Sequence, residues 1–240
     1  MALSPGLSVL LSQLSPLDWV ALGWFTLTWG GYTIIIDHLL ERPWGLNQHM
    51  KRMREQWFMR MIERQERIID SGLVGHVIHS VSIFASSTII VLAALVGLLG
   101  ALKQAYQILM DLAFAIPTTP ELFQLKVLLL IAIFIYGFLR FTWSIRQLNY
   151  ACALIGAAPL PPVEPAVKKH YARHLAQVLS LGMASFNGGL RSYYFGLAAL
   201  GWFVHPWLFV ALTTVMLLVL LRRQLLSRTY RAIHELSTGE

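Results

Sequence analysis

Charge and cysteine are both scarce in this sequence. Asp, Glu, Lys and Arg make up 13% of the 240 residues, whereas soluble domains contain about 25%. Hydrophobic residues make up 56%, and the mean hydropathy is +0.59. The single cysteine, Cys152, excludes an internal disulfide framework and any metal site built from several cysteines. The composition predicts one polytopic membrane domain over residues 1–240, which we expect to be an all-α integral membrane protein.

Two further signals are absent: a cleavable signal peptide and a nucleic-acid recognition motif. Residues 1–15 contain no Lys or Arg, so the positive region that opens a signal peptide is missing, and we expect this end to be retained. The net charge of +7 comes without any recognition motif for DNA or RNA. In membrane proteins an excess of Lys and Arg marks cytoplasmic loops instead, so no nucleic-acid partner is expected.

Residues 71–102 form the longest uncharged apolar stretch, which exceeds the ~20 residues needed to cross a bilayer. At helical spacing one side of this segment carries mostly small residues, which let neighbouring helices approach closely in lipid. This small-residue face consists of Gly75, His79, Ser82, Ser86, Ala93, Gly97 and Gly100. We therefore expect this span to be the packing hub of the domain.

Four other spans are predicted near residues 16–40, 121–148, 188–204 and 206–223. Ser15 before Pro16, and Thr119 before Pro120, have the pattern of a helix cap followed by proline in the first turn. His205-Pro206 divides the last apolar run into a hairpin, because proline interrupts the hydrogen bonds of a helix. Residues 103–121 are predicted to form a loop, and the proline-rich residues 159–165 an extended linker.

Two amphipathic helices are expected on the cytoplasmic side, near residues 45–70 and 165–180. In the first, Lys and Arg alternate with Glu, while Met and Trp recur at helical spacing. Such a helix can lie in the headgroup plane or against the base of the protein itself. The same residues also fit a site for a partner or for anionic lipid headgroups, and both interpretations stay open.

The distribution of basic residues favours five spans, with the N-terminus outside and the C-terminus cytoplasmic. This arrangement leaves only Lys103 and Lys126, of 19 Lys and Arg residues, on the outer side. Four spans would also place on that side the following residues: Arg222, Arg223, Arg228 and Arg231. We therefore predict about five transmembrane helices and expect them to lie in a bacterial cytoplasmic, or inner, membrane.

Four short segments carry a resemblance to a known family. They are Met50-Lys-Arg-Met-Arg-Glu-Gln-Trp57, Arg67-Ile-Ile-Asp70, Phe84-Ala-Ser-Ser-Thr88 and Arg191-Ser-Tyr-Tyr-Phe195. With them the chain resembles the domain of unknown function 599 family of polytopic membrane proteins, over roughly residues 20 to 230. The resemblance implies a membrane location and a helical fold. It implies no activity, and it assigns no role to any residue.

Arg140 is the first candidate for a functional residue, because an ionisable group inside a span is costly and usually has a partner. Asp37 is the only acidic residue expected near the inner end of the spans, so an ion pair between Arg140 and Asp37 is predicted. Backbone carbonyls are an alternative partner. A third alternative is that Arg140 faces a cavity and binds a substrate or a lipid headgroup.

A second candidate is an anion site around two consecutive glycines. Its members are Asn187, Gly188, Gly189, Arg191 and Tyr194. If a helix started here, the free N–H groups of its first turn and the charge of Arg191 would favour an anion. A Gly-Gly pair is also an ordinary helix junction, so this motif is weak.

Histidines are the third candidate, since His38, His76 and His79 are all expected near the inner membrane face. Two imidazoles three or four residues apart on a helix can share a metal ion, but the same spacing arises by chance. A haem would need an axial pair of ligands that sequence cannot identify. No phosphate loop, nucleophile elbow or zinc-protease motif occurs, so no catalytic residue is assigned, catalysis is not expected and the cofactor stays unknown.

Three classes of function remain. Short loops, high apolar content and two amphipathic helices favour an accessory or interaction subunit of a membrane complex. The alternatives are a small transporter, channel or lipid-handling protein that uses Arg140 and a helix break at residues 187–191, and a membrane enzyme with a His-ligated metal or haem. The expected partners are the lipid bilayer, anionic headgroups and other membrane subunits or further copies of this chain.

Overall fold

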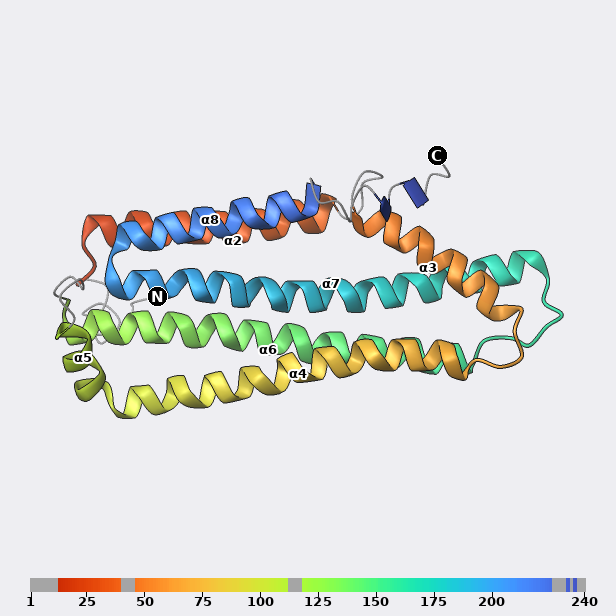
Figure 1. Ribbon diagram of the computed structural model, residues 1–240, viewed down its shortest axis with the longest axis horizontal. Helices are drawn as coiled ribbons and strands as arrows, with labels where there is room; N and C mark the ends of the chain where they lie inside the picture. Colours follow the sequence, from red (N-terminus) through yellow and green to blue (C-terminus); the bar gives the residue numbers. More distant parts are fainter. Residues whose placement is uncertain (1–12, 40–45, 112–117, 226–231, 234, 237–240) are drawn as a thin grey trace, which may run out of the picture. The chain divides into compact units, whose positions relative to one another are not determined.

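The computed structural model describes residues 13–39, 46–111, 118–225, 232–233 and 235–236; the side chains of residues 36–39, 46–47 and 225 are outside this description. The described elements are all helices (Figure 1). In chain order they are α2 (Pro16–Leu39), α3 (Leu46–Ile62), α4 (Ile68–Gly100), α5 (Leu102–Met110), α6 (Pro120–Gly156), α7 (Pro165–Val204) and α8 (Pro206–Leu225). The all-α prediction is confirmed for these residues.

Three helix starts lie where local sequence signals placed them. At the start of α2, the Ser15 hydroxyl accepts a hydrogen bond from the Asp18 N–H at 3.2 Å, and the Asp18 carboxylate accepts one from the Ser15 N–H at 3.0 Å. At the start of α6, the Thr119 hydroxyl accepts the Leu122 N–H at 3.2 Å. α8 begins at Pro206, after a one-residue break at His205. Side-chain caps of this kind satisfy the free N–H groups of a first helical turn.

Other boundaries differ from the sequence prediction. Residues 102–110 form α5 instead of a loop, and α6 continues to Gly156, well beyond residue 148. The largest difference is α7, a single helix of 40 residues that joins the expected amphipathic helix to the fourth span. Its interior contains glycines but no proline, and a glycine weakens a helix by only about 0.5–1 kcal/mol relative to alanine. The helix break predicted at residues 187–191 is therefore wrong.

The chain divides into two compact units, and the division passes through the long helices. Unit 1 contains residues 1–33, 87–137 and 190–219, and unit 2 contains residues 34–86, 138–189 and 220–240. Each unit brings together segments that are distant in sequence. Each of them also has its own set of buried aromatic side chains.

The core of unit 1 is an aromatic cluster from α2, α7 and α8. The ring of Phe25 lies 5.0 Å from that of Phe209 and 5.9 Å from that of Phe195, measured between centroids. Trp202 stacks on Phe209 at 5.6 Å and is almost completely buried. At the edge of the same unit, the Trp24 indole donates a hydrogen bond to the Thr214 hydroxyl at 3.1 Å.

In unit 2, α3 packs against the body of the protein. Phe58, Met61 and Ile62 of α3 are completely buried, whereas Ile68, the first residue of α4, is 77% exposed. Contact with the protein's own base is one of the interpretations that the sequence left open for this helix. Its predicted cytoplasmic location stays a prediction.

Among the described residues, three helices are long and apolar enough to cross a membrane: α4, α6 and residues 206–224 of α8. They indicate a membrane protein, but the described residues do not contain five spans of this length and hydropathy. The apolar half of α7 contains Arg191 and several Tyr, Ser and Gly residues, which lower its hydropathy. In α2, Asp18 in the first turn lowers the hydropathy in the same way.

α4 is not the packing hub that was predicted. In its most apolar window, only 17% of the residues are buried, compared with 44% for α6. A Cβ atom added at Gly75, Gly97 or Gly100 would meet none of the described atoms within 4 Å. His79 and Ser86 are exposed as well. Each part of the small-residue face of α4 is therefore largely uncovered within its own unit, and the close helix contacts that the structure describes lie elsewhere.

Candidate functional site

Arg140 lies in the interior of α6, in unit 2, with its guanidinium against the backbone of α7. Its Nη2 donates a hydrogen bond to the Ala184 carbonyl oxygen at 3.3 Å. A Cβ atom at Gly188 would lie 2.6 Å from this Nη2, so the guanidinium occupies the space that a side chain at residue 188 would fill. The Nε atom is buried and has no hydrogen-bond partner among the described residues. A backbone carbonyl is one of the partners considered from the sequence.

The predicted ion pair of Arg140 with Asp37 is not tested. Asp37 belongs to α2, but its side chain lies outside the described residues. The pair stays a prediction, and so does the binding of a ligand by Arg140. What the structure establishes is that one edge of the guanidinium already faces the α7 backbone.

The glycines of α7 allow close packing with α6 and do not provide a helix start. A Cβ at Gly189 would lie 2.6 Å from Cδ1 of Phe141, whose side chain is completely buried. One and two turns further along α6, the Ser144 hydroxyl donates to the Gly182 carbonyl oxygen at 2.7 Å, and Gln147 accepts from the Ser185 hydroxyl at 2.8 Å. Because N–H groups in a helix interior are already paired within the helix, the basis for the anion site is lost.

The remaining members of that candidate site have different surroundings. Asn187 is exposed in unit 2. Arg191 belongs to unit 1, where it is 7% exposed and lies 5.9 Å from the ring centroid of Tyr32. Tyr194 is half-buried in unit 1. An arginine over an aromatic ring is a common packing arrangement and does not itself indicate a ligand.

The histidine candidates do not form a metal centre in the described part of the chain. Among the side chains that the structure describes, no group of three or more His, Cys, Asp or Glu residues could hold a metal ion. His76 and His79 are exposed on α4. The side chain of His38 lies outside the description. A metal site of three or more such ligands is therefore not found among the described side chains, and the haem alternative stays a prediction.

A polar cluster that the sequence did not predict lies in the core of unit 1. Asp18 and Lys126 are each only 4% exposed, and each lies close to Trp202. The Trp202 indole donates to Asp18 Oδ1 at 2.7 Å, and the Ser15 hydroxyl donates to Asp18 Oδ2 at 2.7 Å. The Lys126 ammonium lies 5.5 Å from the centroid of the Trp202 ring and is attracted by the Asp18 charge. One signal for this cluster was present in the sequence: Asp18 and Lys126 are charged residues near one end of a predicted span, residues 16–40 and 121–148 respectively.

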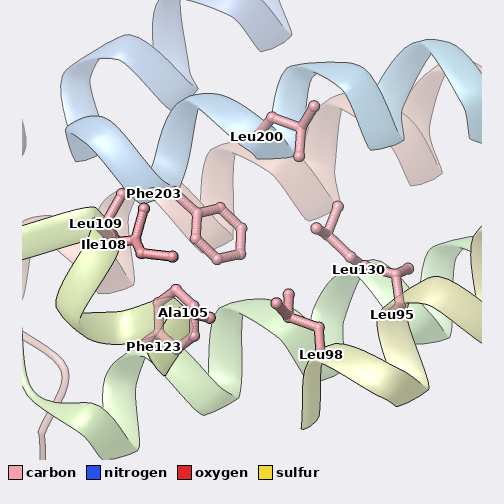
Figure 2. A pocket seen from close by; sticks show the side chains of 9 residues that line it. All are labelled: Leu95, Leu98, Ala105, Ile108, Leu109, Phe123, Leu130, Leu200 and Phe203. Carbon is pink, nitrogen blue, oxygen red and sulfur yellow. The ribbon is translucent and has the colours of Figure 1, made fainter. Parts of the chain in front are cut away.

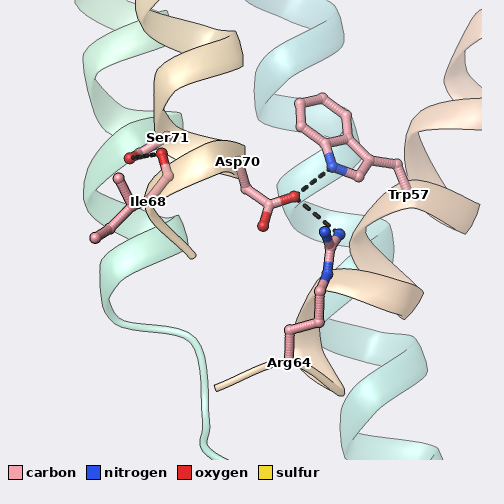
Figure 3. A network of polar contacts seen from close by, with 5 residues as sticks. All are labelled: Trp57, Arg64, Ile68, Asp70 and Ser71. Carbon is pink, nitrogen blue, oxygen red and sulfur yellow. Dashed lines mark hydrogen bonds and ion pairs between the residues drawn. The ribbon is translucent and has the colours of Figure 1, made fainter. Parts of the chain in front are cut away.

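A second polar cluster joins α3 to the start of α4 in unit 2 (Figure 3). Asp70 is 1% exposed, and its Oδ1 accepts hydrogen bonds from the Trp57 indole at 2.7 Å and from Arg64 at 2.9 Å. In the same unit, Arg67 donates to the carbonyl oxygens of Ala158 and Pro159, at 2.5 and 2.6 Å. These contacts fasten the loop between α3 and α4 to the body of the unit.

Two further contacts hold α3 and the loop after it against the first half of α7. Arg54 donates to the Ser180 hydroxyl at 3.0 Å, and burial lowers the pKa of its guanidinium to about 10. Glu63 pairs with Lys168, which lowers the pKa of the Glu63 carboxyl. The charges of this region were a candidate surface for lipid headgroups, but several of them are used within the chain.

A family model described as "Protein of unknown function, DUF599" matches residues 20–229, which confirms the resemblance seen in the sequence. No curated protein and no solved structure matches the chain.

Proposed function

The chain belongs to the family of proteins of unknown function DUF599, and we propose that it is an interaction subunit of a membrane complex. The contact surface in this proposal is the small-residue face of α4. One observation carries the proposal: the face that best suits close helix packing has no neighbour among the described residues, because Gly75, Gly97 and Gly100 face open space.

Lipid alone explains this face poorly. In a bilayer, helices associate through van der Waals packing and interhelical hydrogen bonds, and small residues are enriched where they do so. A face made for lipid would instead carry large apolar side chains, as other positions of α4 do, for example Ile83 and Ile90. His79 is also exposed on this face, and an ionisable side chain in a span usually has a partner. A helix from another subunit, or from a second copy of this chain, would pack closely on the small residues and would supply a partner for His79.

The proposed arrangement in the membrane has five spans. They are α2, α4, α6, the second half of α7 and α8, with the first half of α7 and α3 on the cytoplasmic side. The positive-inside rule supports this proposal, since Lys103 and Lys126 are the only Lys or Arg residues that it places outside. A bacterial cytoplasmic membrane is the proposed location.

Reporter fusions test the arrangement. A reporter joined after Glu240 should give the signal of the cytoplasmic side of the membrane. A reporter joined before Met1 should give the signal of the outer side. The expectation follows from an odd number of spans together with basic residues held inside. Alkaline phosphatase and green fluorescent protein fusions give opposite signals on the two sides of the membrane. An external C-terminus would contradict the five-span proposal.

The proposed contact surface is tested by Gly97→Leu. We expect this variant to fold as well as the wild type, because a Cβ atom at residue 97 would meet none of the described atoms within 4 Å. Its association should weaken by about 1–2 kcal/mol, roughly tenfold, because a leucine keeps two helices apart where glycine lets their backbones approach closely. Association is measured by copurification of two differently tagged copies, and by quantitative mass spectrometry of other copurifying membrane proteins.

The matched control is Val96→Leu, which changes an exposed apolar residue one position away and off the small-residue face. This control should leave association unchanged. Loss of the tagged partner copy would identify a homo-oligomer, and loss of another protein would identify a hetero-complex. If Gly97→Leu and Val96→Leu retain the same partners in the same amounts, α4 is not the contact surface.

A further inference from the structure

We propose that an apolar pocket in unit 1 holds an acyl chain of a bilayer phospholipid (Figure 2). The pocket has a volume of about 440 Å³ and lies between the end of α4, α5, the start of α6 and the end of α7. Its walls include Leu98 of α4, Ile108 of α5, Phe123 and Leu130 of α6, and Phe203 of α7. Figure 2 shows these side chains converging on one space from separate helices.

The chemistry of the lining excludes a polar occupant. All of the residues around the pocket are Leu, Ile, Phe or Ala, and no polar atom lines it. Water needs about two to four polar partners to remain in a cavity, so this pocket does not hold ordered water. Its volume lies within the ~300–1,000 Å³ range of small-molecule sites, which means that a hydrocarbon chain has room to enter.

The position of the pocket decides which hydrocarbon is available. Two of its walls belong to α4 and α6, both of which have the length and hydropathy of membrane spans. The α4 and α6 residues that line the pocket lie in the last turns of α4 and the first turns of α6, near one membrane boundary. Phospholipid tails are the most abundant hydrocarbon at that depth. A chain lying there would cover apolar surface that the helices themselves leave open.

The short helix α5 supports the same occupant. Ala105, Ile108 and Leu109 share one side of α5 and line the pocket, while Lys103 and Gln107 lie on the opposite side. None of the α5 residues is buried within the chain. An amphipathic helix of this kind lies in the interface, with its apolar side toward the tails and its charge at the level of the headgroups. Lys103 is thus placed to complement a lipid phosphate.

The test is native mass spectrometry of protein extracted in mild detergent, with a phosphatidylcholine carrying a photoreactive acyl chain as the probe. The wild type should retain bound phospholipid, and light should cross-link the tail to residues of α5 or the end of α4. Ala105→Trp places an indole in the pocket and should lower the bound fraction about tenfold, the factor expected when two methylene groups lose their burial. Gln107→Trp, on the opposite side of α5, should bind as the wild type does.

A second pair of variants keeps the proposal testable if Ala105→Trp does not fold. Leu200 lines the pocket from α7 but is 50% exposed, so Leu200→Trp can be accommodated and should also reduce binding. Leu197 has 52% exposure and does not line the pocket, and Leu197→Trp is its control. Equal lipid retention by Leu200→Trp and Leu197→Trp would overturn the proposal. So would retention of a free fatty acid or an isoprenoid in place of phospholipid.

Discussion

Gly189→Ala should destabilise the protein by about 1–3 kcal/mol, the usual cost of adding atoms to a well-packed core. The added methyl group would lie 2.6 Å from Cδ1 of Phe141. That ring cannot move aside easily, because the Phe141 side chain is completely buried and packs near the rings of Phe84 and Phe186, with centroids 5.8 and 5.9 Å away. The midpoint of thermal unfolding in detergent, followed by loss of the monodisperse chromatographic peak, measures the effect.

The control is the same substitution where the helix has room. Gly23 of α2 is exposed and meets nothing within 4 Å, so Gly23→Ala should stabilise the protein by about 0.5–1 kcal/mol through the better helix propensity of alanine. Phe141→Leu should partly rescue Gly189→Ala, because the smaller side chain leaves space for the methyl group. A rise in stability for Gly189→Ala alone would show that α6 and α7 do not pack closely at this residue.

Asp18→Leu should have a comparable or larger effect, about 3–5 kcal/mol, because it leaves a buried charge without compensation. The Asp18 carboxylate accepts hydrogen bonds from Trp202 and Ser15 and attracts the buried Lys126 ammonium. Leucine removes all of these interactions, so the Trp202 indole loses its acceptor and Lys126 its countercharge. Unfolding in detergent, followed by near-ultraviolet circular dichroism of the tryptophans, measures the loss.

Two further variants separate this explanation from a general effect of lost charge. Lys126→Leu combined with Asp18→Leu should be more stable than Asp18→Leu alone, since the pair is then replaced by apolar side chains. Asp111→Leu removes an exposed carboxylate in the same unit and should change stability by less than about 0.5 kcal/mol. If the double variant is no more stable than Asp18→Leu, the two charges are not coupled.

The sequence by itself determined the features that depend on neighbours along the chain. Ser15 and Thr119 at helix starts, and Pro206 at the start of α8, act within one helical turn, so their effects can be read without knowing the fold. Long apolar runs likewise established the membrane character. Where local signals conflicted, as at the consecutive glycines of α7, the sequence could not show that the helix continued, because glycine is compatible with both a helix interior and a helix end.

Only the tertiary structure decided which side of each helix is covered. The glycines of α4 and of α7 look alike in the sequence, yet Gly97 faces open space whereas Gly189 lies against the ring of Phe141. Asp18 and Lys126 are 108 positions apart, and no local pattern brings them to the same tryptophan. The physical reason is that helix packing and charge burial depend on pairing between distant segments, while periodicity and capping depend only on residues within a turn.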